Sequence, residues 1–495
     1  MQATLSSIQD YLHSASTTIL ALLFLGVSLV WLCAGDSAWA LSGHTAHRAI
    51  AGLSRSVPGG AALVSFSVGL TRFVVASRPE TARELLTSNA FADRPIKDAA
   101  RSLLFHRAMG FAPSGDYWRA LRRISTTYLF SARRVAASAS CRLAVGEGML
   151  DQVAARGGDV VVMRRVLHGA SLEHVMATVF GTRYDAASQD GVDLEAMVKE
   201  GYELLGMFNW GDHLPLLKWL DLQGVRKGCR RLVRRVDVYV RKIIEEHKHR
   251  RLGGGEGDLL AAGAGDFVDV LLGLEGEDKL AESDMVALLW EMIFRGTDTV
   301  AILLEWIMAR MVLHPDIQAK AQAEIDALVG RGRTVTDADI GSLPYLQCIV
   351  KETLRMHPPG PLLSWARLAV HDAHVGGHLV TVGTTAMVNM WAIAHDPEIW
   401  PEPDAFRPER FAEEDVSVLG SDLRLAPFGA GRRICPGRAL ALATVHLWLA
   451  QLLHRFQWVP ADACGVDLSE RLNMSLEMEK PLLCKAKTRL RPVKY

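Results

Sequence analysis

The stretch of sequence that decides the fold reads Phe428-Gly429-Ala430-Gly431-Arg432-Arg433-Ile434-Cys435-Pro436-Gly437. A cysteine that binds a metal must lose its proton, and backbone N–H groups held close to the sulfur stabilise the resulting charge. Gly431 and Gly437 permit the tight backbone that such a loop requires. An apolar helix expected from Arg438 to Phe456 would direct its positive N-terminal end at the sulfur. The pattern therefore predicts that Cys435 is a metal-binding thiolate rather than an ordinary buried cysteine.

The other cysteines do not form a disulfide framework or a zinc site. Their number is odd, their spacing is wide and no C-x-x-C pair occurs. We expect most of them to be small buried apolar residues in a reducing compartment. They are Cys33, Cys141, Cys229, Cys348, Cys464 and Cys484.

The composition is that of a globular protein with a large core. Of 495 residues, 49% are hydrophobic and 22% are charged, which excludes a disordered chain. The 55 basic and 55 acidic residues give a formal net charge of zero. Because nucleic-acid binding proteins carry a basic excess, we expect no nucleic-acid partner.

The segment from Ile19 to Ala34 is almost wholly apolar. Its length falls slightly short of the roughly 20 residues of a full membrane span, so a buried helix is an alternative. A signal peptide is a second alternative, but the only charge before the segment is Asp10, whereas a signal peptide begins with basic residues. A membrane anchor is favoured, and Arg48 and Arg55 after it place the rest of the chain in the cytosol.

The chain is expected to be mainly helical with a small β portion, an α+β fold. Apolar residues recur at helical spacing from about Thr81 to Ile325, and short runs with Gly and Thr predict strands and a hairpin between Ala369 and Val388. The glycine-rich segment 253–265 lacks the Lys-Ser/Thr of a phosphate loop, so we expect a flexible connection there.

A long apolar stretch runs from Ser283 to His314 and stops at Pro315. Charged residues interrupt it, and these are costly in lipid, so a helix buried in the protein is favoured over a second membrane span. Its centre reads Gly296-Thr297-Asp298-Thr299. We expect the glycine to let the helix open locally there. Such an acid and alcohol can relay protons, although Thr and Asp also bond their own helix backbone.

At every specified position, the cysteine loop resembles the haem-binding signature of the cytochrome P-450 family, F-x-x-G-x-R-x-C-x-G. The resemblance implies the fold of that family and haem b with Cys435 as axial ligand. It implies a monooxygenase that inserts one atom of O₂ into a C–H bond, with Asp298 and Thr299 delivering protons. Electrons would come from NADPH through a membrane-bound reductase.

Other family motifs appear in the expected order. Lys351-Glu352-Thr353-Leu354-Arg355 and Phe406-Arg407-Pro408-Glu409-Arg410-Phe411 imply that Glu352, Arg355 and Arg410 form a buried ionic triad behind the cysteine loop. Taken alone, Glu352 and Arg355 would read as a solvated pair on one helix face.

The resemblance also implies the residues around the haem. Phe428 would pack beside the sulfur, and the other positions would serve the propionates. They are Trp118 and Arg122 in a W-x-x-x-R motif, Arg367 and Arg433, with Arg94 as a further candidate.

Arg295 stands where Ala or Gly is usual in the family, and Val300 stands where Ser or Thr is usual. Arg295 lies four residues before Thr299, so both lie on one helix face near the distal pocket. Arg295 either holds a substrate carboxylate or pairs with Asp298 or Glu291. Comparing a fatty acid with its methyl ester would distinguish the two roles.

Longer stretches such as 110–124 and 291–301 resemble the plant A-type cytochromes P-450 of the KLUH and PLASTOCHRON group, which influence organ growth. The resemblance implies a membrane anchor and short linker in residues 1–46, a catalytic domain in residues 47–495 and location in the endoplasmic reticulum membrane. Only Pro58 remains of the usual proline-rich hinge.

The implied pocket walls are apolar and favour a lipophilic substrate such as a fatty acid. They include 103–105 with Phe105, 207–210, Leu362, Leu363 and Met474, and the implied reductase-docking cations are Arg119, Arg123 and Arg432.

Overall fold

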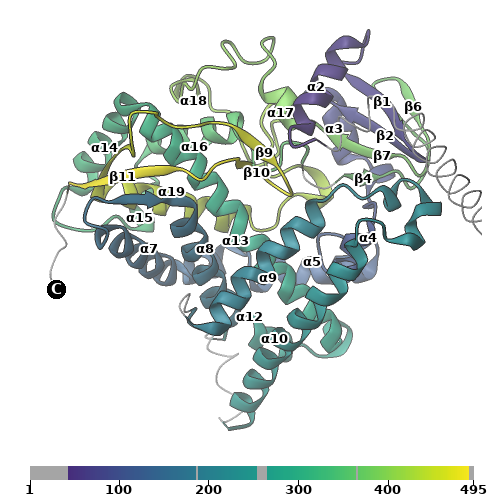
Figure 1. Cartoon of the computed structure of the whole chain (residues 1–495), viewed down its shortest axis with the longest axis horizontal. Coiled ribbons are helices and arrows are strands. Elements are labelled where there is room, and N and C mark those ends of the chain that lie inside the picture. Colours follow the sequence, from purple (N-terminus) through teal and green to yellow (C-terminus); the bar gives the residue numbers. More distant parts are fainter. Residues whose placement is uncertain (1–42, 185–187, 254–264, 364–365, 490–495) are drawn as a thin grey trace, which may run out of the picture.

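The computed structural model describes residues 43–184, 188–253, 265–363 and 366–489. Its centre is the helix α13 (Glu282–Leu313), which crosses the middle of the helical body in Figure 1. Acidic residues in its first turn favour the helix start, and Pro315 follows the residue that ends it. The long buried helix expected from the sequence is therefore present.

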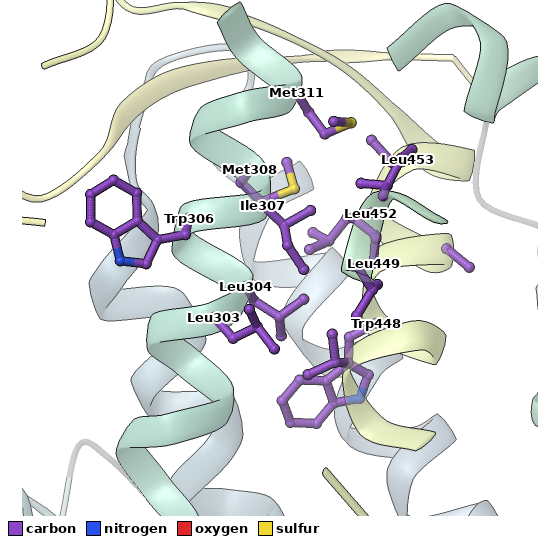
Figure 2. Close-up of a cluster of buried hydrophobic side chains, with 14 of the residues drawn as sticks. Leu303, Leu304, Trp306, Ile307, Met308, Met311, Trp448, Leu449, Leu452 and Leu453 are labelled. Atoms are coloured by element: carbon purple, nitrogen blue, oxygen red, sulfur yellow. The ribbon is translucent and has the colours of Figure 1, made fainter. Parts of the chain in front are cut away.

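The largest core lies between α13 and its helical neighbours. Leu304, Trp306 and Met308 of α13 are fully buried, as are Trp448 and Leu452 of α19 (Arg438–Arg455). Figure 2 shows Leu304 of α13 facing Trp448 and Leu452 of α19, whereas Trp306 points away from α19; all belong to one apolar cluster. Burying each large apolar side chain contributes roughly 1.5–3 kcal/mol. Because α19 begins directly after the cysteine loop, this core fixes the loop relative to α13.

The remaining helices surround these two. They are α2 (Ala46–Ser56), α3 (Pro79–Thr87), α4 (Asp98–Ser102), α5 (Asp116–Tyr128), α6 (Ala132–Ala137), α7 (Ala139–Ala154), α8 (Met163–Phe180), α9 (Gln189–Gly206), α10 (Val225–Gly253), α12 (Phe267–Leu272), α14 (Pro315–Val329), α15 (Asp337–Ile340), α16 (Pro344–Met356), α17 (Met390–Ala394) and α18 (Arg410–Glu413), with short 3₁₀ turns between them. The helix α8 packs along α13.

The β portion consists of small sheets at the edge of the helical body. One has the order β1-β2-β7-β4, in which β2 and β7 run parallel; its strands are β1 (Leu63–Val68), β2 (Thr71–Ala76), β7 (Thr385–Val388) and β4 (Arg367–Leu368). The others pair β3 (Val160–Val162), β11 (Leu483–Thr488) and β8 (Phe456–Pro460), then β9 (Glu470–Leu472) with β10 (Leu476–Met478), and β5 (Ala373–Val375) with β6 (His378–Val380). Gly376 and Gly377, both at positive φ, make the tight turn of the β5–β6 hairpin. The expected mainly α fold with a small β portion is confirmed.

The predicted membrane anchor lies almost entirely outside the described residues, as does most of the expected flexible connection at 253–265. Among the described segments, no helix is both long and apolar enough to cross a membrane. The first described helix, α2, is held tightly. His47 lies 2.8 Å from Glu470 of β9, Arg48 pairs with the same carboxylate, and Asn389 donates to the His47 carbonyl at 2.8 Å.

The glycine in the centre of α13 has a packing role. We expected Gly296 to let the helix open, but α13 runs through it without interruption. A Cβ at Gly296 would lie 2.6 Å from Cγ2 of Val175 on α8. The absence of a side chain therefore allows α8 and α13 to approach closely.

This contact generates a prediction for Gly296→Ala. A stiff β-branched valine cannot turn away, so overpacking of about 1–3 kcal/mol should exceed the gain in helix propensity of about 1 kcal/mol. Thermal unfolding of the full chain should show a lower midpoint. Gly148→Ala on α7 is the control, because nothing lies within 4 Å of a Cβ there; its midpoint should rise. A rise in both variants would contradict the close-packing role of Gly296.

Candidate active site

Cys435 lies in a tight loop directly before α19. Its backbone N–H donates to the Phe428 carbonyl at 2.9 Å, and Gly429 and Gly431 adopt positive φ. A side chain at Gly431 would meet the Leu86 carbonyl at 2.1 Å, so only glycine fits. Burial raises the pKa of the Cys435 thiol, while the Gly437 N–H and nearby arginines oppose the rise. The loop therefore presents a sulfur whose negative form is stabilised by the backbone, as expected.

Cys435 and Phe428 line one wall of a cavity of about 300 Å³, and Thr299 and Val300 of α13 line it as well. Thr299 donates to the Arg295 carbonyl at 3.2 Å, and its side chain is exposed to this cavity. Asp298 is nine-tenths buried and does not line the cavity. The structure therefore brings the alcohol to the cavity and turns the acid away from it.

Five arginines border the same cavity: Arg94, Arg122, Arg295, Arg367 and Arg433. Arg433 donates to the carbonyls of Ala92 and Ala112 at 3.1 and 2.8 Å, yet its buried Nη1 has no hydrogen-bond partner. Burial and the neighbouring cations lower the pKa of Arg367 to about 10. A buried donor and clustered cations favour an anionic ligand. The two propionates of a haem, with its iron facing Cys435, fit this donor set.

Trp118 occupies a different position from the one expected. Its indole N–H donates to the Met109 carbonyl at 3.0 Å, and Arg433 Cζ lies 4.1 Å from the ring centroid. Trp118 does not line the cavity, so it supports Arg433 by a cation–π contact rather than facing the ligand site itself. Arg122, four residues later, does line the cavity and donates to the Ile434 carbonyl beside the sulfur.

Arg295 is paired with Glu291. The two side chains lie one turn apart on α13, with 3.0 Å between Nε and Oε1. Glu291 is almost fully buried and also accepts from the Gly110 N–H at 2.9 Å. Sequence reasoning named Glu291 as a possible partner but missed Gly110. Nothing in the sequence near Arg295 signals that contact, because Gly110 lies far away in the chain.

The expected pocket walls are only partly confirmed. Leu363 lines the cavity beside Cys435, and Leu362 lines a second, outer cavity of about 940 Å³ together with Met207, Phe208, Trp210 and Met474. Phe105 lines neither cavity. It is fully buried and packs against Phe294 and Phe111, with ring centroids 5.0 and 6.0 Å away. The Phe105 ring therefore fills the core behind α13, and a substrate contact at this residue stays a prediction.

Glu352, Arg355 and Arg410 come together in one buried cluster. Arg355 binds Glu352 through two parallel contacts of 2.8 and 2.9 Å, and Arg410 Nε lies 3.1 Å from the same carboxylate. Arg355 also donates to the carbonyls of Ala394 and Pro403, each at 2.8 Å. The cluster thereby ties α16 to the irregular chain that leads toward the cysteine loop.

Known proteins share these features over nearly the whole chain. The profile of the cytochrome P450 family matches residues 31–485. Cytochrome P450 78A5 of Arabidopsis thaliana is 56% identical over 90% of this chain and 86% of its own length. Cytochrome P450 78A1 of Zea mays is 55% identical over 86% of this chain and 79% of its own. A solved zebra fish cytochrome P450 with abiraterone has a TM-score of 0.75 and 26% identity, covering 90% of this chain and 99% of its own.

The buried cluster generates a prediction for Glu352→Ala. Removing the carboxylate leaves two buried guanidinium groups without their shared anion, at a cost of roughly 3–5 kcal/mol. We expect protein with little bound haem and a lowered thermal midpoint. Lys351→Ala is the control on the same helix, since it breaks a surface pair with Asp415 and a distant contact with the Phe411 ring and should cost less than about 1 kcal/mol. Full haem content in Glu352→Ala would refute a role of the cluster in holding the loop.

Proposed function

Because the chain belongs to the cytochrome P450 family and is a monooxygenase of its plant A-type, we propose that it hydroxylates a C–H bond of a small lipophilic substrate, such as a fatty acid, using O₂ and electrons from NADPH delivered by a reductase. The observation that carries the proposal is the placement of Cys435 and Thr299 along one cavity with arginines at its border. A bound haem supplies the activation of O₂ for insertion into a C–H bond.

The residues that would hold the haem follow from the cavity. Cys435 would bind the iron, Phe428 would pack beside the sulfur, and Arg122, Arg367 and Arg433 would bind the propionates. Trp118 would hold Arg433 in place through its cation–π contact and would not touch the haem itself. Glu352, Arg355 and Arg410 would keep the loop rigid without touching the cofactor.

Asp298 and Thr299 would deliver protons to the cavity during the reaction. The Thr299 hydroxyl faces the cavity and can hold a water or a proton there, whereas Asp298 is a buried carboxyl one residue away. A haem-thiolate isomerase or dehydratase that works without a reductase needs no such pair, and neither does a haem sensor. The presence of both groups therefore favours the monooxygenase over these two alternatives.

The largely apolar cavity beside Cys435 supports a lipophilic substrate. Val175, Val179, Met292 and Leu303 contribute to its walls, and apolar walls suit such ligands. Met207, Phe208, Trp210 and Met474 line part of the outer cavity, whose other walls carry charged residues such as Glu203 and Arg471. The relatives' plant origin supports a role in growth and organ size.

The location and the redox partner are extrapolated from the sequence. We propose residues 1–46 as a single anchor in the endoplasmic reticulum membrane and residues 47–495 as a cytosolic catalytic domain. Arg119, Arg123 and Arg432 are exposed and would help to dock the reductase. Two of them already have partners, since Arg119 pairs with Asp116 and Arg123 with Asp278. Arg432, beside the haem-binding loop, is therefore the strongest docking candidate.

A test of the monooxygenase proposal uses Thr299→Ala in the protein reconstituted with a cytochrome P450 reductase and a panel of lipids. We expect NADPH consumption to continue while hydroxylated product falls about tenfold, because a proton donor at the cavity is lost. Hydrogen peroxide should increase in its place. Thr297→Ala is the control, since that hydroxyl is buried and bonds the Ile293 carbonyl. Reductase-independent turnover, or an unchanged product yield in Thr299→Ala, would contradict the proposal.

A second test concerns Arg295. Its charge is already balanced by Glu291, so a substrate carboxylate would gain little there. We expect Arg295→Ala to leave the ratio of affinities for a fatty acid and its methyl ester unchanged, as measured by calorimetric titration. Glu291→Gln, which leaves Arg295 uncompensated, should shift that ratio toward the acid by about tenfold. A selective loss of acid binding in Arg295→Ala would instead support a carboxylate clamp.

A further inference from the structure

Asp298 faces a group that the proposed reaction does not yet use. Adjacent residues on a helix point about 100° apart, so Thr299 faces the cavity while Asp298 faces α8. There, Asp298 Oδ1 lies 3.1 Å from Nδ1 of His168. The other ring nitrogen of His168, Nε2, is buried and has no hydrogen-bond partner. The Nδ1 atom of the imidazole therefore lies within hydrogen-bonding distance of the Asp298 carboxyl.

Charged groups surround this pair from three elements. Arg164, one turn before His168 on α8, binds Glu305 of α13 at 2.8 Å and lies 3.6 Å from Glu477 of β10. Burial, and after it the charge of Glu477, raises the pKa of Asp298 to about 8, while Arg164 opposes the rise. Burial lowers the pKa of His168 to about 4. Near neutral pH, Asp298 is thus a protonated acid beside a neutral imidazole.

Glu477 connects this region with solvent. Its side chain is 23% exposed, and the charges of Lys199 and Glu203 on α9 and of Arg471 on β9 also act on it. Burial, and after it the charge of Asp298, raises the pKa of Tyr202 on α9. The Tyr202 hydroxyl, however, donates to the Phe294 carbonyl at 2.7 Å. Glu477 is therefore a partly exposed carboxyl that Arg164, 3.6 Å away, links to the cluster around Asp298.

We propose that His168 is a positioning residue that holds the Asp298 carboxyl on a proton-supply route from Glu477 to the Thr299 hydroxyl. The inference rests on the proposed function, in which Thr299 works at the cavity. In each delivery Asp298 releases its carboxyl proton toward Thr299 and becomes a carboxylate. A proton from solvent then returns to it through Glu477, so the route ends in its starting state. Between deliveries the hydrogen bond to His168 keeps the carboxyl in place.

The test compares His168→Ala, His168→Gln and Glu477→Gln in the full-length, haem-loaded protein with reductase. Product formed per NADPH is measured across pH in H₂O and D₂O. In the wild type this yield should fall as pH rises through about 8, because Asp298 then loses its proton. His168→Ala and Glu477→Gln should lower the yield at neutral pH by about tenfold, flatten the pH profile and increase the solvent isotope effect. His168→Gln should restore the wild-type profile, because its amide can bond the carboxyl without titrating.

An infrared measurement separates positioning from activity. The protonated carboxyl signal that disappears in Asp298→Asn should shift in His168→Ala and stay unshifted in His168→Gln. Glu479→Gln, an exposed carboxylate just beyond β10, is the control and should change nothing. Suppose that His168→Ala leaves the pH profile and the infrared signal unchanged while Thr299→Ala still diverts electrons to peroxide. The inference about His168 would then be wrong, and the proposed function would stand. If Thr299→Ala instead formed as much product per NADPH as the wild type, the proposed function itself would be wrong.

Discussion

The rest of the structure depends on the repulsion among buried arginines. Burial lowers the pKa of Arg94, Arg367 and Arg433, and the charges of neighbouring arginines, Arg122 among them, lower it further. Such a cluster is unfavourable until an anion balances it. The dianionic propionate edge of a haem would supply that balance, so cofactor binding and folding stability are coupled in this protein. The cysteine loop would then bind the centre of the same molecule whose edge would neutralise the arginines.

The helix α13 serves two environments at once. One face carries Thr299 and Val300 to the cavity, and another carries Asp298 to the polar cluster beside α8. Gly296 brings α8 close enough for this. Because the helix is unbroken and packed on α19, it provides a rigid separation between the polar cluster and the apolar cavity. In the proposed route, protons would reach Thr299 from the polar side of α13, and the substrate would occupy the cavity side.

Much of this could be predicted from the sequence, and the rest could not for a physical reason. The cysteine loop, the long buried helix and the Glu352 triad were predictable because each has local spacing or a family motif behind it. The positions of Phe105 and Trp118 were not, because a helical or loop pattern does not show which distant segment covers a side chain. The contact between Glu291 and Gly110 joins residues 181 positions apart, and no local pattern encodes it.

The attachment of α2 has a mechanical consequence. His47 and Arg48 both pair with Glu470 of β9, and the Asn389 side chain donates a hydrogen bond to the His47 carbonyl. The paired strand β10 lies against α13. A displacement of α2 would therefore be transmitted through Glu470 to the hairpin beside the central helix, so that the first described helix and the helix that lines the cavity are mechanically coupled.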